Sequence, residues 1–294
     1  MKKIISIICV LLGALALFSS TAFAHISNEK NIYDDIQYSK VQEQIVILRT
    51  LGALAAPAGV NLFNSQAKLT RSELAYYIAT FDNLADDTAK EADFQEAAVQ
   101  KKLIISLGGN ATYQDVNNAF FGGKAPMTNG SNELTHEDYV NYLGQFLTKK
   151  VDGKTLYDLA GATPGPAGVI NDAKIIKDVK EDQYFITING SNYKMHPHSK
   201  VLYGPVDLMS WIGKKVDKSV FVTHDGQKVI ALIVSTKGQF ADNEVNASHA
   251  SMETHSMSSK DSKKGSSPVP IIAGVIALIL LGWLFVSWRK KSKS

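Results

Sequence analysis

The spacing of apolar positions changes near the middle of the chain. Before residue 150, apolar side chains recur at helical spacing in several short runs, as in Leu74, Ile78 and Phe81. After residue 168 apolar and polar positions alternate, and the runs are separated by Asn189-Gly190 and Asp225-Gly226. These two dipeptides are typical of tight β-hairpins. The pattern therefore predicts an α+β chain of several domains, with a helical part followed by a small antiparallel β-sheet or barrel.

The helical part is expected to span residues 31–149. Helices are predicted at residues 41–51, 73–81, 97–105 and 137–147. They follow one arrangement used twice, in units 31–84 and 92–148: an aspartate, a helix, a loop, and a Leu-Thr step that opens a second helix. Residues 150–167, rich in Gly and Pro near their end, are predicted to be a linker to the β domain at 168–237. Within that domain, residues 207–212 are expected to form one helical turn.

The first 24 residues have the composition of a secretory signal peptide. Two lysines precede an apolar run at 4–18, and Ala22-Phe23-Ala24 is a small-residue cleavage site. Cleavage there makes His25 the first residue of the mature chain. The other interpretation is an uncleaved N-terminal anchor. Cys9 is the single cysteine and lies in this segment, so the mature chain has no thiol for a disulfide or a zinc-thiolate site.

The end of the chain predicts a membrane anchor. Residues 269–288 carry no charge and would form a helix of about 30 Å, enough to cross a bilayer. The basic residues of 289–294 favour a cytoplasmic tail. Residues 238–268 are polar and are expected to form a disordered stalk. We therefore expect a single-pass protein of the cell membrane whose N-terminal body is extracellular.

The net charge of the part expected outside the membrane differs in sign from the net charge of the whole chain. The chain has 31 basic and 28 acidic residues, a net charge of +3. Removing the two basic residues of the signal peptide and the four of the tail leaves 25 basic residues, a net charge of −3. Nucleic-acid binding needs a concentrated basic face, so no nucleic-acid partner is expected.

The helical part resembles the S-layer homology (SLH) module of bacterial cell-surface proteins. Asp35-Ile36, Leu62-Phe63 and Leu69-Thr70-Arg71-Ser72-Glu73 follow the order of that module. The second unit is a weaker match, with Asp93-Phe94, Phe120-Phe121 and Leu134-Thr135-His136-Glu137. The resemblance covers less than half of the chain. It departs from the family in two ways: the family groups three units and two are found, and the usual tryptophan of the first helix is missing, with Tyr38 near its place.

The resemblance implies binding of cell-wall polysaccharide through Arg71, Thr70 and Glu73. The spacing of Thr70 and Glu73 is that of a helix capping box. A cation at Arg71 opposes the macrodipole of its helix, so it requires an anionic partner. That partner is either the polysaccharide or one of Asp34, Asp35 and Glu73, and both alternatives stay open. In the second unit His136 replaces the arginine, and a structural role is favoured.

Histidine and methionine residues suggest a second function. The mature N-terminus at His25 pairs an amine with an imidazole, and the stalk holds His249, Met252, His255 and Met257. His196 and His198 flank a proline in the β domain. Imidazole with thioether suits copper, Cu(I) especially. The plainer interpretation is that these are ordinary stalk and loop residues, and that His224 is a turn residue.

No catalytic motif is found, whether a nucleophile elbow, a zinc-protease helix or a phosphate loop. The expected function is therefore non-catalytic: a membrane-anchored, wall-associated surface protein that binds wall polysaccharide or a neighbouring surface protein. The alternative is an exported copper- or metal-binding protein; otherwise no cofactor is expected.

Overall fold

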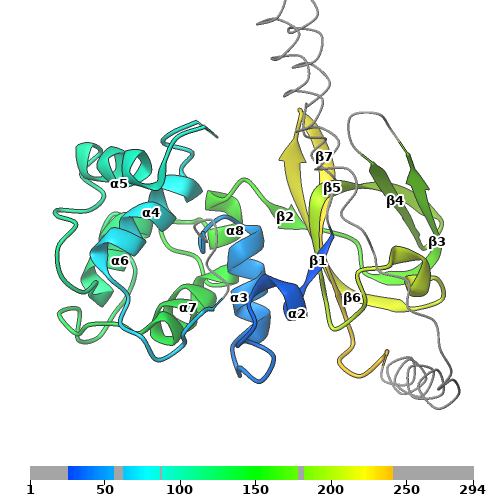
Figure 1. Cartoon of the computed structure of the whole chain (residues 1–294), viewed down its shortest axis with the longest axis horizontal. Coiled ribbons are helices and arrows are strands. Elements are labelled where there is room, and N and C mark those ends of the chain that lie inside the picture. Colours follow the sequence, from blue (N-terminus) through cyan, green and yellow to red (C-terminus); the bar gives the residue numbers. More distant parts are fainter. Residues whose placement is uncertain (1–25, 56–61, 87, 178–181, 241–294) are drawn as a thin grey trace, which may run out of the picture. The chain divides into compact units, whose positions relative to one another are not determined.

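The computed structural model describes residues 26–55, 62–86, 88–177 and 182–240. Within these ranges the chain is α+β, with seven α-helices, two 3₁₀ turns and seven strands (Figure 1). The helices are α2 (Glu29–Ile32), α3 (Gln42–Thr50), α4 (Arg71–Phe81), α5 (Glu91–Gln100), α6 (Tyr113–Phe121), α7 (His136–Gly144) and α8 (Leu156–Leu159). The 3₁₀ turns are η1 (Gln145–Leu147) and η2 (Leu208–Trp211).

Most of the predicted helices are present, with two corrections. The third predicted helix is α5, which begins before the predicted range 97–105. The side chain of Asp93 accepts the Lys90 backbone N–H and so starts α5 at Glu91. It ends at Gln100, so that Ile105 lies outside it and is 83% exposed. Helix α6 was not predicted at all. The short turn expected at 207–212 is confirmed as η2.

The strands are β1 (Ser27–Asn28), β2 (Thr163–Pro164), β3 (Gly168–Ile176), β4 (Gln183–Ile188), β5 (Ser191–Leu202), β6 (Lys215–His224) and β7 (Gln227–Ser235). Both predicted hairpins are confirmed, since β4 pairs with β5 and β6 with β7 in antiparallel fashion. The turn residues have positive φ, at 49° and 81° for Asn189 and Gly190 and at 50° and 71° for Asp225 and Gly226. Asn, Asp and Gly adopt this conformation most readily, which is why these dipeptides mark such turns.

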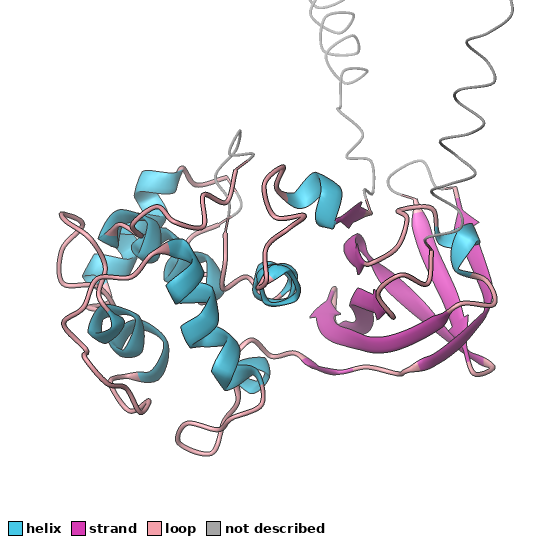
Figure 2. Cartoon of the chain, turned by 90° about the horizontal axis from the view of Figure 1, so that it is seen from below, coloured by secondary structure: helices cyan, strands magenta, loops and turns pink. Residues whose placement is uncertain are grey.

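Five of the strands close into a barrel (Figure 2). Strands β6, β3, β4 and β5 lie side by side in the order of a Greek key, and β7 joins β6 to β5. A five-stranded Greek-key barrel is also the architecture of OB-type barrels. The expectation of a purely antiparallel sheet is wrong, because β5 and β7 are parallel, as are β1 and β5. The connection through η2 returns β6 antiparallel to β3, so its hairpin partner β7 must run in the same direction as β5.

The helices and the barrel share part of one hydrophobic core. Leu202, Val220, Leu232 and Val234 of the barrel strands belong to the same buried cluster as the helical core. A second cluster fills the barrel around Trp211, which is fully buried. At the boundary, Lys218 Nζ lies 2.6 Å from Glu43 Oε1 of α3. The segment predicted as a linker contributes α8 and β2, and β2 pairs with the edge of β6.

Several predicted segments lie outside the described residues. These are the signal peptide at 1–24, most of the stalk at 238–268, the membrane span at 269–288 and the tail at 289–294. Among the residues that are described, no helix is both long and apolar enough to cross a bilayer.

Candidate functional site

Three short segments of the helical part meet in a closed ring of backbone hydrogen bonds. The Leu69 N–H donates to the Leu134 carbonyl at 3.0 Å, the Leu134 N–H donates to Ala111 at 3.0 Å, and the Ala111 N–H donates to Leu69 at 2.7 Å. All three residues are fully buried. Each segment thus donates one backbone hydrogen bond and accepts one, so the three segments are arranged around a common centre.

Each segment leads into a helix through the same capping chemistry. Thr70, Thr112 and Thr135 are the N-cap residues of α4, α6 and α7. Each hydroxyl accepts the backbone N–H three residues on, and the carboxylate there, Glu73, Asp115 or Asp138, accepts the N–H of the threonine. The predicted capping box of Thr70 and Glu73 is therefore confirmed. Three capped helices leave the ring in equivalent positions.

Sequence reasoning missed the middle repeat. It placed Phe120-Phe121 in a loop, whereas these residues end helix α6. The Thr-x-x-Asp spacing at Thr112 and Asp115 could have revealed it, because it is a capping-box pattern. The match was hidden because Ala111 stands where the other two repeats have leucine.

The residue after each threonine occupies a junction between two repeats. The backbone N–H of Arg71 donates to the Gly109 carbonyl, that of Tyr113 to Asn132, and that of His136 to Ala67, at 3.0–3.1 Å. Each of these side chains is also placed near the capping carboxylate of the following repeat. The three junctions therefore have the same backbone and three different side chains: a guanidinium, a phenol and an imidazole.

At the first junction the arginine is held by the protein itself. Arg71 Nε donates to Asp115 Oδ2 at 3.0 Å, and Arg71 Nη1 donates to the Gly108 carbonyl at 3.0 Å. The two side chains are 29% and 12% exposed. The anionic partner within the protein is Asp115 of α6, in place of the Asp34, Asp35 or Glu73 that were considered from sequence. The cation that opposes the dipole of α4 is thereby compensated by the carboxylate that caps α6.

At the third junction a histidine takes the place of the arginine. His136 Nδ1 lies 2.7 Å from the Phe63 carbonyl and Nε2 lies 3.5 Å from Glu73 Oε1, an ion-pair distance at which no well-formed hydrogen bond is made. Burial lowers the pKa of His136, but contacts with Glu73 and Phe63 outweigh it, so the pKa is raised. Burial raises the pKa of Glu73, but His136 and Thr70 outweigh it and lower that pKa to about 2. The pairing is the equivalent of Arg71 with Asp115.

The second junction has no cation. Burial raises the pKa of Tyr113, and the nearby charge of Asp138 raises it further. A phenol cannot form an ion pair with the capping carboxylate while it is protonated, so this junction is electrically different from the other two.

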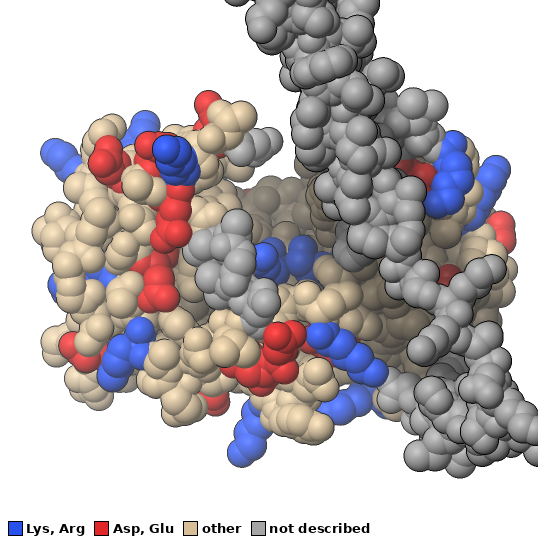
Figure 3. Space-filling model, viewed as in Figure 1, with Lys and Arg blue, Asp and Glu red and all other residues tan. Residues whose placement is uncertain are grey.

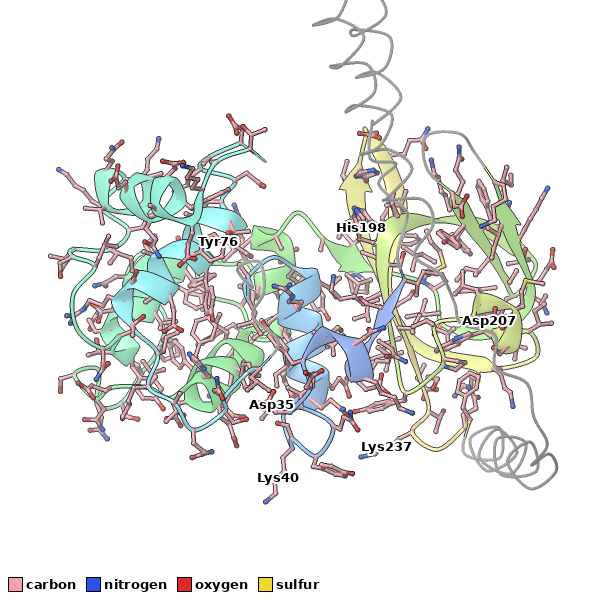
Figure 4. The ribbon with its side chains drawn as sticks, viewed as in Figure 1. Asp35, Lys40, Tyr76, His198, Asp207 and Lys237 are labelled. Carbon is pink, nitrogen blue, oxygen red and sulfur yellow. The ribbon has the colours of Figure 1, made fainter. Side chains whose placement is uncertain are left out.

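The structure also places Asp35 and Tyr38 of the first repeat. Asp35, between α2 and α3 (Figure 4), accepts the backbone N–H groups of Phe63 and Asn64 at 2.8 and 2.7 Å. It therefore fixes the loop that leads towards Thr70. Tyr38, suggested as a stand-in for the missing tryptophan, is 96% exposed and packs in no core.

Three imidazoles lie together on the barrel: His196 and His198, which were expected in a loop, lie within strand β5, and His224 is the last residue of β6. The ring centroids of His196 and His224 are 4.5 Å apart, and those of His196 and His198 are 6.0 Å apart. His196 Nδ1 accepts the backbone N–H of His198 at 3.0 Å, which leaves the proton of a neutral ring on Nε2. Burial first, then the neighbouring His224 and His198, lower the pKa of His196 to about 4. His224, read from sequence as a turn residue, joins this cluster.

No metal site is preformed in the part of the chain that is described: no group of three or more His, Cys, Asp or Glu side chains there is arranged to hold an ion. His25 and the stalk residues His249, Met252, His255 and Met257 lie outside the described residues.

The space-filling view in Figure 3 shows acidic and basic side chains interspersed on the visible face. Recognition on that face would therefore depend on individual side chains.

Comparison of the chain with protein families, curated proteins and solved structures gave no match.

Proposed function

We propose that this chain is a non-catalytic surface protein of a bacterium, anchored in the cell membrane by residues 269–288, whose helical part binds cell-wall polysaccharide or a neighbouring surface protein. The observation that supports it most is the ring at Leu69, Ala111 and Leu134, from which three capped helices leave in equivalent positions. The SLH family, which the sequence resembles, groups three units. The middle repeat, with its cap at Thr112, brings the number of capped segments to three, and this agreement in number supports the proposal.

The repeats also provide places where a polymer can be held. At each junction the start of one helix lies against the loop before the next, so a chain of sugar units could contact more than one of them. Arg71 is already paired with Asp115, so an anionic sugar at that junction would have to share the guanidinium. We therefore infer that Arg71, Thr70 and Glu73 hold the junction together. The polymer then contacts the surface beside these three residues.

Sedimentation with purified walls tests this function. The full chain is mixed with intact walls, and with walls from which the polysaccharide has been extracted. We expect it to pellet with the intact walls only. Equal pelleting with extracted walls would point to a protein or peptidoglycan partner, and no pelleting with either would contradict wall binding.

Protease treatment of intact protoplasts tests the proposed orientation. Protease added outside should remove the body and leave a membrane-embedded fragment that ends at Ser294. Survival of the body in intact protoplasts, with digestion only after lysis, would contradict the extracellular placement.

The metal-binding alternative has less support. His196 uses Nδ1 to accept a backbone N–H, and burial, followed by the neighbouring His224 and His198, lowers its pKa to about 4. The alternative then depends on His25 and the stalk. Titration of Cu(I) into the full chain, compared with a variant in which Met252 and Met257 are both replaced by Leu, tests that dependence.

A further inference from the structure

Four exposed apolar side chains gather around the 3₁₀ turn η2 of the barrel. They form an apolar patch of Val169, Val206, Met209 and Ile212, each between 41% and 48% exposed. Val169 belongs to β3, and this strand is joined to the turn because the Gly213 N–H donates to the Ile170 carbonyl at 2.8 Å. Single exposed apolar side chains are common on soluble proteins, but a group of them marks a surface that another apolar surface can cover.

The geometry of η2 explains why the patch is at the surface. A 3₁₀ helix has about three residues per turn, so residues three positions apart lie on the same side. Leu208 and Trp211 belong to the core of the barrel and are 1% and 0% exposed. Met209 and Ile212 have the same spacing but lie on a different side of the turn. Burial of Trp211 therefore leaves Met209 and Ile212 outside the barrel.

The last described residues of the chain lie beside the same turn. The Phe240 ring packs on Trp211 with centroids 4.8 Å apart, and the Gln239 amide binds the N–H and the carbonyl of Lys215 at 2.9 and 3.1 Å. The expected stalk therefore starts from the barrel next to the patch. A flexible chain as long as residues 241–268 has an r.m.s. end-to-end distance of about 30 Å. A membrane span at 269–288 would thus keep the patch close to the bilayer.

The charges beside the patch are compatible with a bilayer surface that contains anionic lipid. Lys214 follows the turn, its Nζ lies over an aromatic ring at 5.4 Å, and it forms no ion pair with a described residue. Asp207 is the one acidic side chain of the turn, and its carboxylate accepts the Met209 N–H at 3.1 Å and the Ser210 hydroxyl at 3.0 Å. A lysine beside apolar side chains is typical of segments that lie in a membrane interface.

The patch lies on the side of the barrel away from the helices. Figures 2 and 4 both show η2 on that side, and Asp207 at its start is labelled in Figure 4. Contact of this side with the membrane would direct the three repeats outwards, towards the wall. The position of the patch therefore agrees with the proposed wall-binding function.

A membrane span would make a small patch sufficient for binding. Once the chain is anchored, contact of the patch with the same membrane is an intramolecular step, with an effective concentration in the millimolar range for a short flexible linker. A stable protein interface needs about 800 Å² on each partner, more than a few part-exposed side chains provide. The bilayer is therefore the occupant that the patch fits best.

We propose that the apolar patch at η2 inserts into the surface of the membrane that anchors the chain. Met209 and Ile212 enter the boundary between headgroups and acyl chains, and Lys214 lies among the headgroups. This inference rests on the proposed membrane anchor and adds a second membrane contact, which fixes the direction in which the helical part points.

A fluorophore at residue 209 tests this contact in the full chain. Cys9 is the only cysteine, so Cys9→Ser combined with Met209→Cys gives a single labelling site. The protein is reconstituted into vesicles of phosphatidylcholine and phosphatidylglycerol, and quenching by spin-labelled lipid is compared with quenching by iodide in the water. We expect strong quenching by the lipid and weak quenching by iodide. The matched control carries the same fluorophore at Tyr38→Cys, 96% exposed in the helical part, and should show the reverse.

Two substitutions that make the patch polar test its role in insertion. Val206→Ser and Ile212→Ser, added together to the Met209→Cys protein, should reduce quenching by lipid at least about threefold, because they remove apolar surface that the bilayer would cover. The melting temperature should change little, since both side chains are exposed in the folded protein.

Quenching by iodide at residue 209 as strong as at residue 38, or quenching by lipid that the two serines leave unchanged, would overturn the proposal. Protection from both quenchers would also overturn it and would indicate a second copy or another protein on the patch. Extraction with sodium carbonate separates these results from failure of the anchor. A chain that stays in the membrane while only iodide quenches residue 209 keeps its anchor and rejects the patch. A chain that carbonate removes contradicts the anchor, and this inference with it.

Discussion

The residue after each capping threonine gives each junction its chemistry. The backbone is the same at Arg71, Tyr113 and His136, because each N–H donates to the loop of a neighbouring repeat. The side chains produce a permanent ion pair at Arg71, a protonated phenol at Tyr113 and a pH-dependent pair at His136. Sequence alone showed that Arg71 needed an anionic partner, but it could not identify Asp115, which lies 44 residues away.

Replacement of Arg71 by Ala should destabilise the fold. It leaves Asp115, only 12% exposed, without its cation and breaks the bond to the Gly108 carbonyl. Charged hydrogen bonds contribute about 1.5–3 kcal/mol, and part exposure reduces this, so we expect a loss of about 1–2 kcal/mol in urea unfolding.

Lys124→Ala is the control for that experiment, because it removes an ion pair with Asp152 whose side chains are 61% and 69% exposed. It should change stability by less than about 0.5 kcal/mol. If both substitutions have the same small effect, the Arg71 pair does not support the fold, and Arg71 becomes free for ligand contact.

The pair of His136 and Glu73 should make stability depend on pH. The folded state raises the pKa of His136, so it holds the proton more tightly than the unfolded chain does. The resulting stability is fully present below the ordinary imidazole value of about 6.5 and is lost as the pH rises through the raised value. The lowered pKa of His196 gives the opposite trend up to about pH 6.5, so melting temperatures should fall when measured from about pH 7 to pH 8.5.

His136→Gln should remove most of that slope while the fold is kept. Glu73 acts in a different window: its lowered pKa provides stability above about 4.5 that is lost as the pH falls towards 2. The two groups can therefore be separated in one pH series. A native profile that is flat above the ordinary imidazole value would contradict the pairing.

At the scale of elements, the sequence predicts correctly those features that a few neighbouring residues determine. The hairpins at Asn189-Gly190 and Asp225-Gly226 and the cap of Thr70 were readable because a few neighbouring residues determine them. The ring was not readable, since it joins segments 42 and 23 residues apart through backbone atoms. Helix α6 was missed because its repeat has lost the leucine that marks the other two.

The three ring-forming repeats should respond alike to loss of their caps. Thr70→Ala, Thr112→Ala and Thr135→Ala each remove a side-chain acceptor at a helix start and should each cost about 1 kcal/mol, within a range of 0.5–2. Thr155→Ala, which removes the cap of the short helix α8 away from the ring, is the matched control and should cost less. Urea unfolding of the four variants measures this. If Thr112→Ala alone leaves the free energy of unfolding unchanged, the middle repeat is not equivalent to the other two.

At the scale of the molecule, the helical and barrel parts are less separate than the change of spacing predicts. Residues 229–235 of β7 are all buried, because Ile230 and Ile233 face the barrel interior while Leu232 and Val234 join the helical core. The sequence did carry a sign of this, since a continuous apolar strand is typical of burial on both faces. The parallel pairing of β5 and β7 follows from the Greek-key connection and could not be read from local pattern.

The shared core predicts a single cooperative unfolding transition. Leu232→Ala creates a cavity between helices and barrel and should cost about 2–5 kcal/mol. A signal that reports on the helices and a signal that reports on the barrel should show one transition, shifted by the same amount, because both parts lose the same contact. Two separate transitions, with only the barrel signal shifted, would show that the parts fold independently.

The central claim, that wall polysaccharide binds at the junctions of the three repeats, is tested most directly by hydrogen exchange. Exchange of the full chain is measured with and without soluble polysaccharide released from walls. The account predicts slower exchange in the segments that form the junctions, residues 67–73, 109–115 and 132–138, with the barrel unchanged. Protection confined to the barrel, or no protection where binding is saturated, would contradict it.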